Sequence, residues 1–227
     1  MANLQKTYDY AGGQSVTRNK VLRNTYWLLS LSMIPTVLGA AVGVAFGVPI
    51  PAGFLGALLF LGIAFGFIWA IEKNKHSGAG VALLLGFTFF MGLMLTPLLT
   101  RTLGFSNGGT LIMLAFGGTA SIFAVLASIA TVSKRDFSGV AKFAMIGLVG
   151  IILASLANIF FAIPALTLTI SVLAIGIFSA FILYDVQRIV NGGETNYVSA
   201  TLALYLDVYN IFTSLLQILG FAGGSRD

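Results

Sequence analysis

Residues 142–161, KFAMIGLVGIILASLANIFF, and residues 165–189, ALTLTISVLAIGIFSAFILYDVQRI, are two apolar runs separated by Pro164. A helix needs about 20 apolar residues to cross the hydrocarbon core of a bilayer, and each run reaches that length. Proline interrupts a helix because it lacks the backbone N–H and its ring clashes with the preceding turn. The two runs therefore predict neighbouring transmembrane helices joined by a short turn.

The same scan along the whole chain predicts seven membrane-spanning helices. They cover residues 25–47, 53–71, 79–100, 110–132, 142–161, 165–189 and 200–219. The first six are continuous apolar runs. The seventh contains Asp207, Asn210 and Gln217, so it either crosses the membrane surrounded by the other helices or forms a re-entrant segment.

The composition excludes most other classes of protein. Of 227 residues, 58% are hydrophobic and only 8% are charged, whereas a soluble domain carries about 25% charged residues. We therefore expect no soluble enzyme, no nucleic-acid partner and no disordered chain. The chain has no cysteine, and its single histidine, His76, lies in a charged loop, so the sequence predicts no thiolate metal site, no metalloprotease and no cofactor.

The segments divide the chain into a polar amino-terminal tail at residues 1–24, a seven-helix domain at residues 25–220 and a short carboxyl-terminal tail at residues 221–227. Ten lysines and arginines fall on one side of the predicted bundle, and only Arg101 and Arg226 on the other. Basic loops stay in the cytoplasm. The amino terminus is thus predicted to be cytoplasmic and the carboxyl terminus outside, unless the seventh segment is re-entrant.

Glycines recur at four-residue intervals in the first two predicted helices: Gly39, Gly43 and Gly47 in the first, and Gly62 and Gly66 in the second. Small residues at this spacing let helix backbones approach closely in lipid. The favoured interpretation is packing inside the bundle. The alternative is homodimerisation through the first helix.

Of the seven acidic residues, only Asp185 and Asp207 fall inside apolar segments, near the end of the sixth and the start of the seventh. Their depths differ by only ~3 Å at 1.5 Å per residue, and the two helices run antiparallel, so the carboxyl groups can meet. Adjacent carboxylates at low dielectric constant share one proton and titrate as a coupled pair. The pair is predicted to sense pH on an ion pathway and, when ionised, to offer oxygen ligands to calcium.

A structural role for the two aspartates is the alternative. Arg188 follows Asp185 by three residues, a spacing that allows a salt bridge along one helix face. Asp207 can equally bond a hydroxyl such as that of Tyr184 or Tyr205. An acidic residue inside a membrane is by default a functional candidate, which favours the pH-sensing interpretation.

Further polar residues follow Asp207 along the seventh segment. Asn210, Ser214 and Gln217 come after it at intervals of three, four and three residues, which places all four on one helical stripe. Such a stripe supports either a water-accessible path or hydrogen bonds between helices.

The chain resembles the Bax inhibitor family of membrane proteins in LYD at residues 183–185 and LYLDVYNIF at residues 204–212. It is similar to the bacterial YccA-like branch of that family in VLRNTY at residues 21–26, GGETNY at residues 192–197 and LGFA at residues 219–222. The resemblance covers nearly the whole chain. It implies an all-α integral membrane protein of the bacterial inner membrane, with seven helices of which the seventh is central.

The resemblance also implies two functions. Members of the YccA-like branch are associated with binding and restraining the membrane-anchored protease FtsH, with the cytoplasmic tail involved. Other members are associated with a pH-sensitive calcium leak gated by an aspartate pair, which maps onto Asp185 and Asp207. Leak-type relatives carry an arginine near the end of the second helix, and here Lys73 or Arg188 is the candidate replacement.

We therefore expect a non-enzymatic modulator of FtsH, with a calcium leak as an added or alternative function. A remote alternative is an intramembrane aspartyl protease, because Tyr184-Asp185 and Asp207 provide a carboxylate pair. Such proteases carry their second aspartate in a Gly-x-Gly-Asp motif, whereas here Tyr205-Leu206 precedes Asp207.

Overall fold

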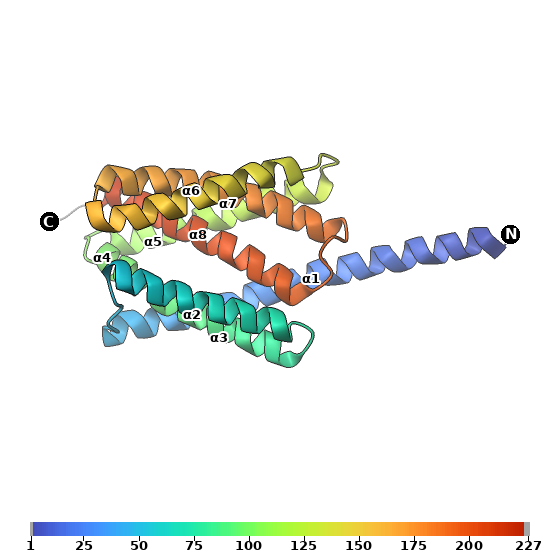
Figure 1. The fold of residues 1–227 in the computed structure, drawn as a ribbon, viewed down its shortest axis with the longest axis horizontal. Coiled ribbons are helices and arrows are strands. Elements are labelled where there is room, and N and C mark those ends of the chain that lie inside the picture. Colours follow the sequence, from blue (N-terminus) through green and yellow to red (C-terminus); the bar gives the residue numbers. More distant parts are fainter. Residues whose placement is uncertain (1, 225–227) are drawn as a thin grey trace.

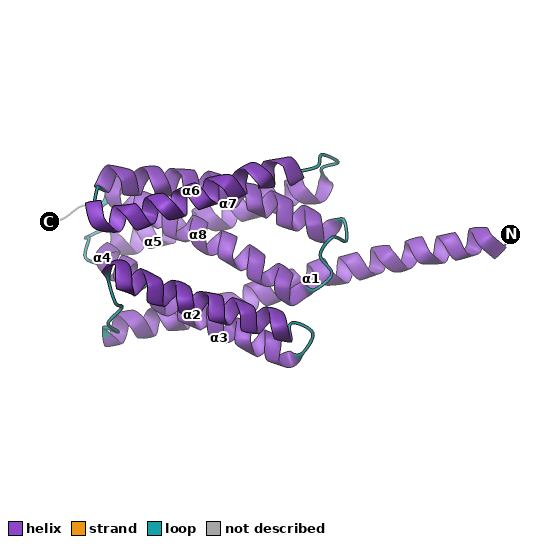
Figure 2. Ribbon diagram, in the orientation of Figure 1, coloured by secondary structure: helices purple, strands orange, loops and turns teal. Residues whose placement is uncertain are grey.

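The described residues form eight helices and no strand. The computed structural model describes residues 2–224, with side chains from residue 19 onward. In chain order the helices are α1 Ala2–Phe46, α2 Gly53–Asn74, α3 Gly78–Met94, α4 Thr96–Leu103, α5 Gly108–Val132, α6 Ser138–Phe161, α7 Pro164–Val190 and α8 Tyr197–Gly223. All except the short α4 run roughly along one direction (Figure 1), and short loops join them (Figure 2).

Six of these helices are long and apolar enough to cross a membrane, and the bent pair α3 and α4 makes a seventh if it counts as one span. The apolar runs that predict α2, α5, α6 and α7 each correspond to a single helix. The polar seventh segment, residues 200–219, lies within α8, which is one unbroken helix of 27 residues. The chain is therefore a helical membrane protein with six or seven candidate spans.

Residues 79–100 were predicted to form one continuous helix, and the structure corrects this. The helix breaks between α3 and α4, which are bent by 41°. Pro97 has no N–H to donate to the carbonyl of Leu93. The hydroxyl of Thr96 donates to that carbonyl instead, at 2.6 Å. The bend therefore costs no unsatisfied backbone acceptor at Leu93.

Residues 2–24 of the amino-terminal tail and residues 221–223 of the carboxyl-terminal tail are helical. The polar residues 2–24 form the first part of α1. The apolar span of this helix covers Asn19–Phe46. The amino-terminal part of α1 extends beyond the bundle (Figure 1). At the other end α8 continues to Gly223, and residues 225–227, with Arg226, lie outside the described part of the chain.

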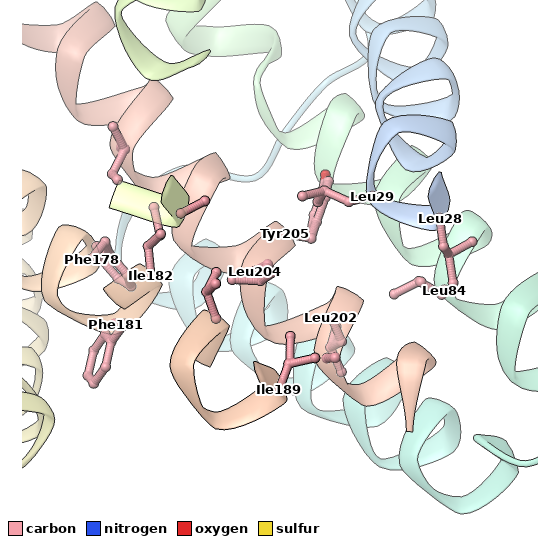
Figure 3. Close-up of a cluster of buried hydrophobic side chains, with 14 of the residues drawn as sticks. Leu28, Leu29, Leu84, Phe178, Phe181, Ile182, Ile189, Leu202, Leu204 and Tyr205 are labelled. Atoms are coloured by element: carbon pink, nitrogen blue, oxygen red, sulfur yellow. The ribbon is translucent and has the colours of Figure 1, made fainter. Parts of the chain in front are cut away.

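Helix α8 is the most buried of the candidate spans. It packs chiefly against α7, α5 and α1, with smaller contacts to α2, α3 and α4. In its most apolar stretch 39% of the residues are buried, against 28% or less in the other single-helix spans. Figure 3 shows its side chains between those of α1 and α3 on one side and α7 on the other, namely Leu202, Leu204 and Tyr205 facing Leu28, Leu29, Leu84, Phe178 and Ile182.

The outer surfaces of the bundle are apolar. Trp27, Phe143 and Phe160 are each more than two-thirds exposed. In water such faces would drive association. In a bilayer they face acyl chains, while the helices satisfy their own backbone hydrogen bonds.

Three glycines allow α1 to pack at close range against α3 and the start of α4. A Cβ atom on Gly39 would overlap the carbonyl oxygen of Phe89, and one on Gly92 would overlap the carbonyl oxygen of Thr36. A Cβ on Gly43 would likewise overlap the side chain of Thr96. The small-residue face of α1 is thus used inside the bundle, as the favoured interpretation of the sequence predicted.

The other glycines of the predicted ladders have different environments. Gly47 has a φ of +59° and ends α1 in a turn, where a side chain would be strained. Gly62 and Gly66 meet open space, because a Cβ on either would have no neighbour within 4 Å. The prediction that these two pack inside the bundle is wrong.

Replacing Gly92 by alanine is expected to destabilise the protein, because backbone atoms of α1 occupy the space that the methyl group needs. The cost should be about 1–3 kcal/mol, the range for overpacking a core. The matched change Gly66→Ala should be neutral or slightly stabilising, since alanine is the better helix former by about 1 kcal/mol. Thermal unfolding in detergent measures both, and equal melting temperatures would contradict the close α1–α3 contact.

Candidate functional site

The loop between α7 and α8 is held by Glu194. Its Oε1 accepts hydrogen bonds from the backbone N–H groups of Thr195 and Asn196, both at 2.9 Å. Its Oε2 forms an ion pair with Arg188 at 3.5 Å. Arg188 also donates through Nε to the carbonyl of Gly193 at 3.3 Å. The loop therefore folds back onto the last turns of α7.

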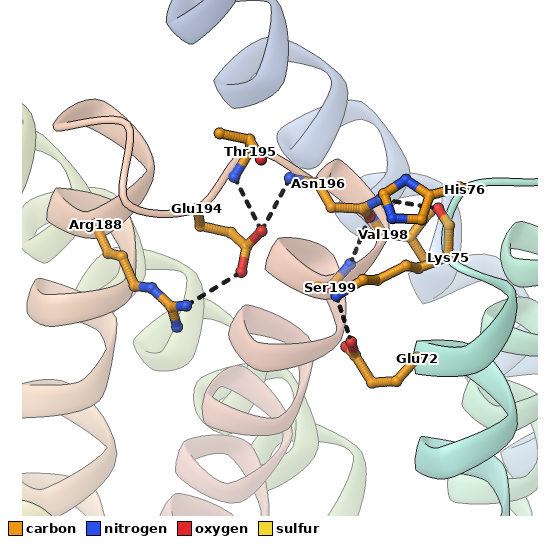
Figure 4. Close-up of polar contacts among 9 residues, drawn as sticks. All are labelled: Glu72, Lys75, His76, Arg188, Glu194, Thr195, Asn196, Val198 and Ser199. Atoms are coloured by element: carbon orange, nitrogen blue, oxygen red, sulfur yellow. Dashed lines mark hydrogen bonds and ion pairs between the residues drawn. The ribbon is translucent and has the colours of Figure 1, made fainter.

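Asn196 connects this loop to the α2–α3 loop (Figure 4). Its Oδ1 accepts from the N–H groups of Val198 and Ser199, which caps the amino terminus of α8. Its Nδ2 donates to the carbonyl of Lys75 at 3.0 Å and lies 3.3 Å from Nδ1 of His76. One amide thus fixes the start of α8 against the end of α2.

The packing of α7 against α8 brings Asp185 and Asp207 together. Their side chains interact directly with each other. Asp207 is 4% exposed, and its Oδ2 is buried without a hydrogen-bond partner. A protonated carboxyl can donate to a neighbouring carboxylate, whereas two ionised ones repel each other. The arrangement is therefore suited to holding one shared proton.

The alternative partners of the two aspartates make other contacts. The hydroxyl of Tyr205 lies 2.9 Å from that of Thr36 and donates to the carbonyl of Thr88. The ion pair of Arg188 is with Glu194 rather than with Asp185. Of these alternative partners, Tyr205 thus bonds Thr36 and Thr88, and Arg188 pairs with Glu194.

Lys73 and Arg188 were the candidate replacements for the arginine of leak-type relatives. Lys73 lies over the ring of Trp69, 4.9 Å from its centroid, a cation–π contact on the outside of α2. Arg188 lies near enough to Asp185 to act on it electrostatically. Only Arg188 therefore lies beside the acidic pair.

A pocket of 370 Å³ reaches Asp185 from the ends of α2, α7 and α8. Charged side chains around it are Glu72, Lys75, Asp185, Arg188 and Glu194. Lys75 and Glu72 form an ion pair at 2.9 Å, and this hydrogen bond raises the pKa of Lys75, which stays protonated. Asp207 is not part of the lining and lies behind it, in contact with Asp185.

Only some of the polar side chains in the α8 stripe bond to another helix. Gln217 accepts a hydrogen bond from Ser171 of α7 at 3.0 Å. Asn210 donates to the carbonyl of Leu206 in its own helix, and Ser214 is buried. The stripe thus contacts another helix at Asp207, which meets Asp185, and at Gln217, which accepts from Ser171.

Sequence reasoning missed four pocket residues: Glu72, Lys75, Glu194 and Ser199. GGETNY at residues 192–197 was a motif of the resemblance, but nothing in it alone showed that Glu194 holds Arg188. Lys75 lies in the basic loop between the second and third predicted helices. The charge of that loop was used only to predict the orientation of the chain in the membrane.

These features define the class as a helical membrane protein with a buried acidic pair between two adjacent helices. The family model described as "Inhibitor of apoptosis-promoting Bax1" matches residues 18–224. The chain therefore belongs to the Bax inhibitor family.

Relatives cover nearly the full chain. A protein of Escherichia coli K12 named "Modulator of FtsH protease YccA" is 39% identical over 212 residues, 93% of this chain and 94% of its own length. An uncharacterized protein of Neisseria meningitidis is 38% identical over 216 residues, 93% of this chain and 95% of its own length. An uncharacterized membrane protein of Vibrio cholerae is 39% identical over 207 residues, 91% of this chain and 92% of its own.

Substitutions of Asn196 are expected to separate its two roles. Asn196→Asp keeps the oxygen that caps α8 but loses the donor to Lys75, whereas Asn196→Ala loses both. We expect the alanine variant to lose about 1–2 kcal/mol of stability and the aspartate variant less. Thermal unfolding checks this, with Asn191→Ala at an exposed position of the same loop as control. Equal stability of all three variants would contradict the connecting role.

Proposed function

We propose that this protein modulates an FtsH-type membrane protease in a bacterial inner membrane. The observation that carries the proposal is 39% identity over 93% of the chain to the Escherichia coli protein named as a modulator of that protease. A second Escherichia coli relative with the same identity is named an inner membrane protein. The family assignment favours a modulator over an intramembrane aspartyl protease.

The proposed topology has seven spans, with α3 and α4 forming one bent span and α8 in the centre. The amino terminus lies in the cytoplasm and the carboxyl terminus outside. The lysine and arginine distribution supports this orientation. The polar part of α1 then projects into the cytoplasm, where it is available to bind the membrane-anchored protease.

Deleting residues 2–18 is expected to weaken binding to the protease while leaving the bundle folded, because the apolar span of α1 begins at Asn19. Co-purification of tagged full-length and truncated chains with FtsH measures the loss. We expect recovery of the protease to fall about tenfold, the factor that corresponds to a loss of 1.4 kcal/mol.

The control for this deletion is thermal unfolding of the truncated chain in detergent, which should match that of the full chain. Undiminished recovery of FtsH by a truncated chain that melts normally would overturn the role of the amino-terminal segment.

A pH-gated calcium leak is a second proposed function, and it can coexist with the first. It is supported by the contact between Asp185 and Asp207, by the unpartnered Oδ2 of Asp207, and by the pocket that reaches Asp185. Loss of the shared proton would leave two charges in contact, and their repulsion would favour separation of α7 and α8. An ionised pair would also provide oxygen ligands for the cation.

Asp207→Asn is expected to abolish the pH dependence of calcium entry into vesicles, because an amide cannot share or release the proton. The wild type should show different flux at pH 6 and pH 8. Asp185→Asn should behave like Asp207→Asn, whereas Asp136→Asn, in the exposed α5–α6 loop, should behave like the wild type. A calcium-sensitive dye inside the vesicles reports the flux. Identical pH profiles for wild type and Asp207→Asn would contradict the proposed gate.

A further inference from the structure

The pocket at the ends of α2, α7 and α8 has the size of a ligand site. Its 370 Å³ lies within the range of about 300–1,000 Å³ that is usual for small-molecule sites. Only one of its charged residues, Asp185, belongs to the acidic pair. Below the charged mouth the lining is apolar and includes Ile189, Leu202 and Leu206.

Charges of both signs face the pocket from two sides. Glu72 and Lys75 come from the end of α2, and Arg188 and Glu194 from the end of α7 and its loop, with the start of α8 between them (Figure 4). With Asp185 ionised, three carboxylates and two cations line the space. A ligand that carries both a cation and an anion would match this pattern better than a ligand with a single negative charge.

Ser199 provides an independent sign of a missing partner. Its side chain lines the pocket, and its Oγ is buried without a hydrogen-bond partner. A buried hydroxyl without a hydrogen-bond partner is destabilising. A polar ligand atom in the pocket would satisfy this hydroxyl, which can both donate and accept.

The pocket is lined from α2 on one side and from α7 on the other, with the start of α8 between them (Figure 4). Among the described residues, α2 packs on α3, α6 and α8, and it makes no packing contact with α7. Phe54 of α2 meets Phe160 of α6 at a centroid distance of 5.5 Å, near the opposite end of α2. From there α2 diverges from α6 and α7 toward the charged loops (Figure 1). Glu72, Lys75 and Arg188 lie at the ends of the candidate spans α2 and α7, which is the level of the headgroups if these helices cross a bilayer.

We propose that this pocket binds the phosphoethanolamine headgroup of a membrane phospholipid. The phosphate would take charge-assisted hydrogen bonds from Arg188 and Lys75, and the primary ammonium would bind the carboxylates of Asp185 and Glu72. The hydroxyl of Ser199 would complete the polar contacts. The acyl chains would leave between α2 and α7. This binding requires neither protease modulation nor ion flux.

The headgroup chemistry gives the first test. Native mass spectrometry of the full-length protein in detergent compares phosphatidylethanolamine, phosphatidylcholine and phosphatidylglycerol with identical acyl chains. We expect phosphatidylethanolamine to bind about tenfold more tightly than the other two. Phosphatidylcholine has no N–H donors for the carboxylates, and phosphatidylglycerol adds a negative charge without an ammonium group. Equal retention of phosphatidylethanolamine and phosphatidylcholine would overturn the proposal.

Two lysines of the same segment give a matched pair of variants. Lys75 lines the pocket and Lys73 does not, so Lys75→Gln should weaken the binding of phosphatidylethanolamine about tenfold and Lys73→Gln should leave it unchanged. Ser199→Ala should also weaken this binding, whereas its lipid-free melting temperature should not fall, because the hydroxyl has no partner in the lipid-free pocket. If Lys75→Gln and Lys73→Gln have equal effects, or if Ser199→Ala binds like the wild type, the site is wrongly placed.

Soluble glycerophosphoethanolamine distinguishes a lipid from a free metabolite. The same headgroup without acyl chains should displace the lipid only at a concentration at least tenfold higher, because the chains add apolar contact along α2 and α7. Displacement at equal concentration would contradict a lipid ligand and assign the pocket to the soluble compound.

Discussion

A polar group inside a bilayer must find its partner within the protein, and α8 is the helix on which this constraint acts most strongly. It carries Asp207, Asn210 and Gln217 within a span that is long enough to cross the membrane. A lipid-facing position would leave these groups without partners. Burial against α1, α5 and α7 follows from this requirement, and the apolar outer faces of the other helices then meet the lipid.

The close crossing of α1 and α3 serves the same requirement. Gly39 and Gly92 let the two backbones approach, which brings the carbonyl groups of α3 within reach of α8. The hydroxyls of Tyr205 and Tyr209 donate to the carbonyls of Thr88 and Met91. In lipid, where small-residue contacts replace the hydrophobic effect as the driving force for helix association, polar bonds of this kind give α8 a defined rotation.

Apolar length predicted most of the fold, because a run of about 20 apolar residues has few alternatives to a membrane helix. Helical rise alone placed Asp185 level with Asp207. The bend at Pro97 was not predicted, because hydropathy continues through it while only the missing N–H breaks the helix. Nor could the sequence separate Lys73 from Lys75, because the direction of a side chain in the last turn depends on where the helix ends.

The loop after α7 explains why Asp185 lines the pocket without an ion pair to Arg188. Arg188 lies one helical turn from Asp185, and on an isolated helix that spacing favours a salt bridge. In the folded chain Glu194 pairs with Arg188 instead, and its other oxygen is held by the N–H groups of Thr195 and Asn196. Asp185 is thereby left beside Asp207. The GGETNY loop thus controls the electrostatics of the acidic pair without belonging to it.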